Sequence, residues 1–197
     1  MNLANKITIS RMAITALIII ILLFPFESAG INFTNLFINE LIVVNAKYII
    51  VGILFVIALI TDYLDGYVAR KKDMVTELGD TLDYIADKLL IDSVLIILSS
   101  QGFLHPFIPV IIIGRDYVAN AIRMTALKKN ITLKSVKIDK YKNIIIKIGV
   151  ALTLFYNLPF ELFNLNISDI LLIVGTVLSV ISCIQYYNDN RRKIIKA

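Results

Sequence analysis

Six stretches of mostly apolar residues recur along this chain, each close to the length that an α-helix needs to cross a lipid bilayer. A membrane-spanning helix requires about 20 such residues. The chain of 197 residues is 58% hydrophobic, whereas soluble domains are usually about 45–50% apolar. The pattern predicts an all-α, polytopic membrane protein made of one domain, residues 1–197. The six predicted transmembrane helices are 12–28, 46–66, 82–101, 106–127, 143–160 and 168–187.

Lysine and arginine residues are distributed unevenly between the segments that connect these spans. They precede the first span, follow the second, fill the loop between the fourth and fifth, and end the chain. The alternate loops, 29–45, 102–105 and 161–167, contain no lysine or arginine. Because basic loops stay on the cytoplasmic side of a membrane, we expect a multi-pass cell-membrane protein with both termini in the cytoplasm.

Residues 2–10 mix polar and apolar side chains before the first apolar stretch. A short amphipathic helix in the membrane interface fits this composition, and a flexible terminus fits it equally well. The predicted fold therefore consists of six transmembrane helices plus a short N-terminal interfacial helix.

Acidic residues gather at the cytoplasmic ends of spans two and three. Asp62 and Asp65 are three residues apart and Asp83 and Asp87 are four apart, so each pair shares one helix face. Carboxylates that face one another near a bilayer repel and are costly to bury. Oxygen ligands of this kind suit Mg²⁺ or Mn²⁺. The four aspartates therefore predict a divalent-cation site; the alternative is a charged hairpin whose acids pair with nearby basic side chains.

Small residues accompany these acids. Gly66 and Ala69 have small side chains and therefore leave space on the helix surface beside Asp65. Gly79 lies at the start of the next helix that carries acidic residues. Small residues allow a substrate to approach the backbone closely. They also serve helix packing in membranes, so their presence alone does not establish a substrate site.

The acidic stretch resembles the signature sequence of the CDP-alcohol phosphatidyltransferase family at every fixed position. The matching residues are Asp62, Asp65, Gly66, Ala69, Arg70, Gly79, Asp83 and Asp87, in the spacing D-x2-D-G-x2-A-R-x8-G-x3-D-x3-D. The six-span layout agrees with the fold of that family. The resemblance implies that a CDP-linked lipid gives its phosphatidyl group to an alcohol and that CMP leaves.

The resemblance also implies a role for each signature residue. The four aspartates would hold two divalent cations, Mg²⁺ or Mn²⁺, and Asp87 would in addition act as general base on the acceptor hydroxyl. The residues implied to lie along the CDP-lipid are Asp62, Gly66, Ala69, Arg70 and Gly79. The active site would then face the cytoplasm.

Basic residues in and after span four predict the charge of the acceptor. Arg115 and Arg123 are close to two helical turns apart, so both can point into one cavity. Arginine suits phosphate recognition, and Lys140 and Lys142 could cover the same cavity from the adjacent loop. The alternatives are that Arg115 pairs with Asp116 or another aspartate and that Arg123 meets lipid headgroups.

This region is similar to that of bacterial phosphatidylglycerophosphate synthases, a subfamily that uses sn-glycerol 3-phosphate. Asn5 and Thr8, together with Arg11, match the N-x2-T-x2-R opening of that subfamily, which lies near the substrates. In the basic loop, Asp139 stands where the subfamily usually has the glycine of a Gly-Lys-x-Lys-Thr element.

The resemblance implies CDP-diacylglycerol, sn-glycerol 3-phosphate, the lipid bilayer and a second copy of the chain as partners, and no nucleic acid. Within the family, cardiolipin synthesis or an inositol-phosphate acceptor is the alternative. Outside it, the acids could form the binding site of a divalent-cation transporter, or the chain could be an inactive lipid-binding relative.

Overall fold

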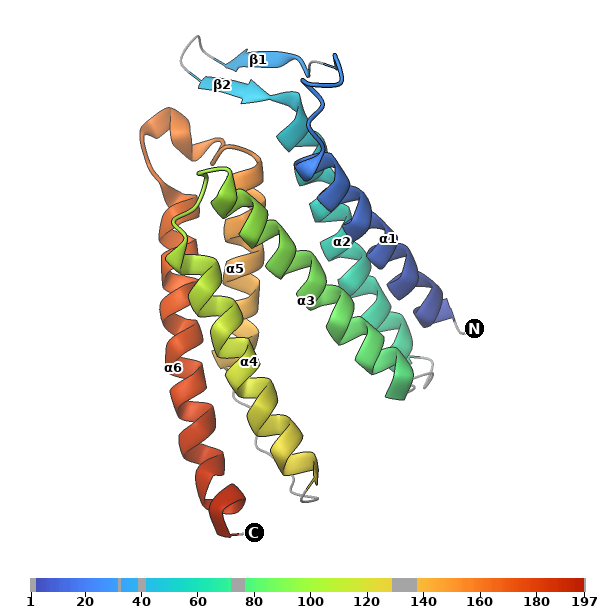
Figure 1. Cartoon of the computed structure of the whole chain (residues 1–197), viewed down its shortest axis with the longest axis vertical. Helices are drawn as coiled ribbons and strands as arrows, with labels where there is room; N and C mark the ends of the chain where they lie inside the picture. Colours follow the sequence, from blue (N-terminus) through green and yellow to red (C-terminus); the bar gives the residue numbers. More distant parts are fainter. Residues whose placement is uncertain (1–2, 32, 39–41, 72–76, 129–137, 197) are drawn as a thin grey trace. The chain divides into compact units, whose positions relative to one another are not determined.

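The computed structural model of the chain is almost entirely helical, which confirms the predicted fold class (Figure 1). It describes residues 3–31, 33–38, 42–71, 77–128 and 138–196, with some side chains inside helices outside the description. The α-helices are α1 (Leu3–Leu23), α2 (Ala46–Lys71), α3 (Glu77–Ser100), α4 (Phe107–Lys128), α5 (Ile138–Leu154) and α6 (Ile167–Lys196). The remaining elements are the strands β1 (Asn35–Ile38) and β2 (Ile42–Asn45) and the 3₁₀ helix η1 (Phe160–Phe163).

Each predicted span overlaps one of these six helices, but their membrane character is a separate question. Within the described residues, one helix is long and apolar enough to cross a membrane by length and composition, α6 over Ile167–Asn190. The apolar part of α1, Thr8–Leu23, is shorter. Charged residues interrupt the apolar sequence of α3 and α4. The helices are therefore confirmed, whereas six membrane crossings stay a prediction.

The predicted short N-terminal helix does not exist as a separate element, because α1 is continuous from Leu3 to Leu23. The sequence between these residues contains no glycine or proline that would break a helix. The helix ends shortly before Pro25, whose ring cannot continue it. One face of α1 is buried along most of its length through Thr8, Arg11, Thr15, Ile18 and Leu22.

The chain divides into two compact units, and the first comprises residues 1–97 together with 154–158. Here α1 packs along α2 (Figure 1). Gly52 of α2 allows this unit to close around Phe155, since a Cβ at position 52 would lie 2.9 Å from the phenyl ring. Tyr156 stacks edge-on against Tyr48, and its hydroxyl accepts a hydrogen bond from the Asn45 amide.

A β-hairpin precedes α2 in the segment that the sequence predicts as a loop, residues 29–45. Strands β1 and β2 are antiparallel, with Leu36 opposite Val44 and Phe37 opposite Val43. The run Ile42-Val43-Val44 is β-branched and therefore favours a strand. This local signal is present in the sequence, and the all-α prediction omits it.

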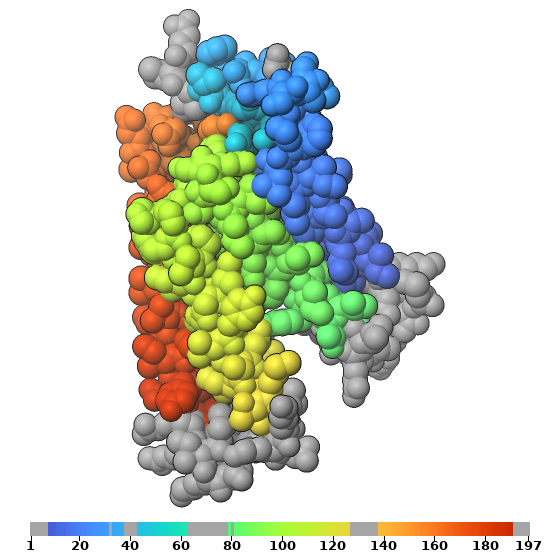
Figure 2. Space-filling view, viewed as in Figure 1, coloured from blue at the N-terminus to red at the C-terminus, as the bar shows by residue number. Residues whose placement is uncertain are grey.

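The second unit comprises residues 98–153 and 159–197. Helix α4 packs lengthwise against α6, and their side chains abut along one visible face (Figure 2). Glycines let α5 and α6 approach closely. A Cβ at Gly149 would lie 2.9 Å from Leu172, and a Cβ at Gly175 would lie 2.7 Å from Ile146.

The close approach of α5 and α6 leads to a prediction about two helical glycines. Replacing Gly175 with alanine is expected to lower the free energy of unfolding by about 1–2 kcal/mol, because the new methyl group overlaps the buried Ile146. Gly114 on α4 is the matched control, since nothing lies within 4 Å of its added Cβ. Gly114→Ala should raise that free energy by roughly 0.5–1 kcal/mol.

Chemical unfolding of the detergent-solubilised variants, followed by circular dichroism, measures both changes. If both substitutions changed the free energy of unfolding by the same amount, helix propensity alone would explain the changes. That result would contradict the close packing at Gly175.

Candidate functional site

Two clusters of charged residues, one in each unit, contain four of the described candidates: Asp62, Asp83, Arg115 and Lys142. The first joins three helices of the first unit. Arg11 of α1 places its Nη1 2.8 Å from the Asp62 Oδ1 of α2 and 2.7 Å from the Asp83 Oδ1 of α3. Because one nitrogen contacts both carboxylates, Asp62 of α2 and Asp83 of α3 lie close together at this point.

The burial of these groups differs. The Arg11 side chain is fully buried, whereas 24% of the Asp62 side chain and 46% of the Asp83 side chain are exposed. A buried guanidinium is tolerated where carboxylates neutralise it. Among the described contacts of this cluster one cation faces two carboxylates, so these three groups carry a net negative charge.

The other predicted residues of this unit are placed as follows. Asp87 is half-buried and lies on α3 one helical turn after Asp83. Gly79 lies on the same helix one turn before Asp83. Thr8 is buried one turn before Arg11 on the same face of α1. The side chains of Asn5, Asp65, Gly66, Ala69 and Arg70 lie outside the described residues.

The donor chemistry of this cluster fits a hard divalent cation, because the acids supply carboxylate oxygens and carry excess negative charge. Within the described side chains, no group of three or more His, Cys, Asp or Glu residues gathers around one point. Asp65, one of the four predicted ligands, is outside that search. The two-cation site therefore stays a prediction.

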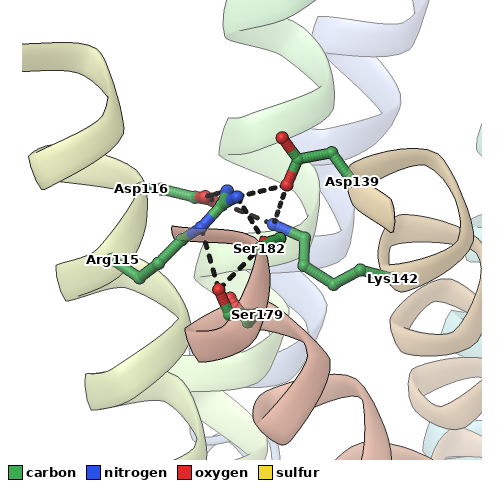
Figure 3. Close-up of polar contacts among 6 residues, drawn as sticks. All are labelled: Arg115, Asp116, Asp139, Lys142, Ser179 and Ser182. Carbon is green, nitrogen blue, oxygen red and sulfur yellow. Dashed lines mark hydrogen bonds and ion pairs between the residues drawn. The ribbon is translucent and has the colours of Figure 1, made fainter. Parts of the chain in front are cut away.

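The second cluster, called the Arg115 cluster below, joins three helices of the second unit (Figure 3). Its six members are Arg115 and Asp116 of α4, Asp139 and Lys142 of α5, and Ser179 and Ser182 of α6. The Arg115 guanidinium lies at its centre and contacts groups from all three helices. It therefore fixes the relative positions of α4, α5 and α6 around a polar interior.

Arg115 uses each of its nitrogens. Nε donates to the Ser179 carbonyl oxygen at 3.1 Å, and Nη1 donates to the Asp116 carboxylate at 2.8 Å. Nη2 donates to the Asp139 carboxylate and to the Ser182 hydroxyl oxygen, the latter at 2.6 Å. Arg115 therefore contacts Asp116 and Asp139, as the alternative interpretation describes, and its role toward an acceptor stays a prediction.

Lys142 is the second cation of the Arg115 cluster. Its Nζ lies 3.4 Å from the Asp116 Oδ1 and 4.0 Å from the Asp139 Oδ1. The lysine is almost fully buried, so its charge is held in place by these two acids. The structure thus brings together Arg115 and Lys142, two of the four predicted acceptor residues, while Arg123 and Lys140 are exposed.

Three members of the Arg115 cluster, Asp139, Ser179 and Ser182, are absent from the sequence-based prediction of the site. Ser179 and Ser182 are three residues apart in a mostly apolar part of α6, which places them on one helix face. That spacing of two small polar residues is a signal that could have identified them. In the sequence, Asp139 is noted only as the residue that replaces the usual glycine of the Gly-Lys-x-Lys-Thr element.

Comparison with known proteins decides the family. A profile of the CDP-alcohol phosphatidyltransferase family matches residues 1–181. The chain belongs to the CDP-alcohol phosphatidyltransferase family. This result confirms the resemblance that the aspartate signature indicates.

Individual members of the family cover nearly the whole chain. The CDP-diacylglycerol–glycerol-3-phosphate 3-phosphatidyltransferase of Bacillus subtilis is 34% identical over 189 residues, which cover 96% of this chain and 95% of the relative. The enzyme of the same name from Rickettsia bellii is 28% identical, covering 94% and 93% of the two chains.

A solved structure shares the fold of this chain. The crystal structure of phosphatidylinositol phosphate synthase from Mycobacterium tuberculosis superposes with a TM-score of 0.62. The comparison covers 96% of this chain and 89% of that one. Sequence identity is 18%, so this likeness supports the CDP-alcohol phosphatidyltransferase fold and leaves the choice of acceptor to other evidence.

Proposed function

We propose that this protein transfers the phosphatidyl group of CDP-diacylglycerol to sn-glycerol 3-phosphate, giving phosphatidylglycerophosphate and CMP. It is an enzyme of phospholipid biosynthesis, a phosphotransferase. The observation that carries this conclusion is the end-to-end match to the Bacillus subtilis relative of that name. The filled aspartate signature and the paired Arg115 and Lys142 agree with it.

The chemistry assigned to this chain is a substitution at phosphorus. The acceptor hydroxyl oxygen forms a bond to the phosphorus that carries the diacylglycerol, and the bond from that phosphorus to the CMP oxygen breaks. Asp87 accepts the hydroxyl proton, which makes the oxygen a better nucleophile. The half-buried position of Asp87 on the same helix face as Asp83 supports this role.

The aspartates Asp62, Asp65, Asp83 and Asp87 are proposed to hold two divalent cations. When bound, Mg²⁺ or Mn²⁺ would neutralise the diphosphate and the charge on the departing CMP. Gly66, Ala69, Arg70 and Gly79, with Asp62, are proposed to line the CDP-lipid. The net negative charge around Arg11 supports cation binding at this point of the first unit.

Arg115 and Lys142 are proposed to bind the phosphate of the acceptor, with Arg123 and Lys140 nearby. Arg115 of α4 is held in place by its hydrogen bonds and Lys142 of α5 by its ion pair with Asp116, and both are cations of the kind that binds phosphate. Asn5 and Thr8 remain candidates for contacts with the substrates.

A multi-pass position in the cell membrane with cytoplasmic termini is proposed from the basic loops. The exposed face of α6 supports contact with lipid, because large apolar side chains recur along it at helical spacing. They are Ile170, Ile173, Val174, Val177, Ile181 and Ile184. A homodimer and a cytoplasmic active site are part of the same proposal.

The test is release of CMP from CDP-diacylglycerol by the purified, detergent-solubilised protein with Mn²⁺. With sn-glycerol 3-phosphate as acceptor, kcat/KM should exceed that with inositol phosphate or phosphatidylglycerol by at least about tenfold, because a polar pocket discriminates by its paired groups. Preference for inositol phosphate or phosphatidylglycerol would favour the alternative activities. Absence of CMP release with every acceptor would contradict the transferase function itself.

A further inference from the structure

Asp139 differs from the other charged members of the Arg115 cluster in its access to solvent. The side chains of Arg115 and Asp116 are each 9% exposed and that of Lys142 is 2% exposed, whereas that of Asp139 is 34% exposed. Its carboxylate nevertheless contacts the Arg115 Nη2 and lies 4.0 Å from the Lys142 Nζ. Asp139 is thus a partly solvated anion that faces both buried cations.

We propose that Asp139 is an internal competitor of the anionic acceptor and thereby sets the affinity of the Arg115 cluster for phosphate. This inference rests on the proposed function, in which Arg115 and Lys142 bind the acceptor phosphate. A phosphate oxygen takes the place of the Asp139 carboxylate on Arg115 and Lys142, and Asp139 turns to solvent. Asp139 is therefore an affinity-determining residue rather than a catalytic one.

The charge balance of the cluster is the first reason. With Asp139 in place, two cations face two carboxylates, so the cluster offers no net attraction to an anion. When Asp139 leaves, Asp116 is the carboxylate that remains among the described contacts of Arg115 and Lys142, and these three groups carry a net positive charge. Asp116 is buried between both cations and stays as their permanent partner.

The position of Asp139 keeps the free-energy cost of its displacement low. It lies in the first turn of α5, where free backbone N–H groups favour a negative charge. It is also already one-third exposed, so water can replace the contact with Arg115. A buried carboxylate such as Asp116 would lose far more stabilising free energy if it were separated from its cationic partners.

Ser179 supplies an independent observation from the third helix. Its side chain is fully buried, and among the described residues its Oγ has no hydrogen-bond partner. Its carbonyl oxygen, in contrast, accepts from both the Arg115 Nε and the Ser182 hydroxyl. A buried hydroxyl without a partner is unfavourable, and a bound phosphate oxygen beside Arg115 would accept a hydrogen bond from it. The cluster therefore contains an unused donor at the position where an anion is expected.

The decisive variant is Asp139→Asn, which keeps the shape of the side chain and removes its charge. KM for sn-glycerol 3-phosphate and the inhibition constant of inorganic phosphate should both fall by about threefold to tenfold, because the competing anion is gone. Asp139→Glu keeps the charge and should keep both constants near wild type. Asp169, an exposed acid in the first turn of α6, provides the matched control Asp169→Asn, which should change neither.

A rise in KM for Asp139→Asn, or a fall in kcat alone, would overturn the proposal, because Asp139 would then only position Arg115. Unchanged constants would overturn it as well. Failure of the proposed function is distinguishable, since wild-type protein would then release no CMP with sn-glycerol 3-phosphate.

Ser179→Ala tests the second half of the inference with a separate readout. Removal of an unsatisfied buried hydroxyl should leave the thermal unfolding midpoint unchanged or higher. KM for sn-glycerol 3-phosphate should rise by about threefold to tenfold, because the phosphate loses a donor. An unchanged KM would show that the Ser179 hydroxyl does not contact the acceptor.

Discussion

Asp87→Asn is expected to lower kcat for CMP release by roughly 10³- to 10⁵-fold while the protein keeps its fold. A general base contributes about 10²- to 10⁴-fold, and the same carboxylate is proposed to hold a divalent cation, so its loss removes two contributions at once. Asparagine has the same shape and cannot accept the proton. Asp87 lies on α3 one turn from Asp83, whose carboxylate already meets that of Asp62 at Arg11.

Asp92→Asn is the matched control for this substitution. Asp92 lies on the same helix and is also half-buried, but no role in the reaction is assigned to it. The rate of CMP release by the Asp92→Asn variant should stay within about threefold of wild type. Circular dichroism of both variants verifies that the helices are retained. Activity of Asp87→Asn within tenfold of wild type would exclude Asp87 as the base.

Arg11→Gln is expected to lower the free energy of unfolding by about 2–3 kcal/mol. Removal of one partner from a buried ion pair typically costs about 3–5 kcal/mol, and partial exposure of Asp62 and Asp83 reduces this value. Without the guanidinium, two carboxylates from neighbouring helices face each other. Chemical unfolding of the detergent-solubilised variant, followed by circular dichroism, measures the loss.

The same variant has a second expected property. Because Asp62 and Asp83 lose their internal cation, Mn²⁺ should raise the thermal unfolding midpoint of Arg11→Gln more than that of wild type. Arg123→Gln is the matched control for stability, since Arg123 is an exposed arginine on α4 and should change the free energy of unfolding by less than about 0.5 kcal/mol. Equal stability of Arg11→Gln and Arg123→Gln would contradict a structural role for the Arg11 contacts.

The contacts of Arg11 also show where prediction from sequence ends. The spacing of Thr8 and Arg11 places them on one face of a helix, and in the structure both side chains are buried. That the face meets Asp62 and Asp83 is not visible from spacing, because Asp83 lies 72 residues further along the chain. Periodicity describes one helix, whereas this contact depends on how three helices pack.

The Arg115 cluster follows the same division. Arg115 and Lys142 are identifiable from residue type and position, and the sequence also allows the contact of Arg115 with an aspartate that the structure shows. Ser179 is 64 residues from Arg115 in sequence and yet supplies one of its acceptors. Arg123 and Lys140 are exposed because other sides of their helices face the neighbouring helices. The sequence of one segment does not specify which side of a helix faces a neighbour.

The sequence by itself determined the helical class, the number of long helices, the aspartate signature and, through it, the family. These properties are local, since hydrophobic length, helical spacing and a motif are all contained within short segments. The packing of the helices was needed to show that Arg11 joins Asp62 to Asp83 and that Asp139 contacts the two buried cations. These features depend on which distant side chains share a low-dielectric interior, where each buried charge requires a partner.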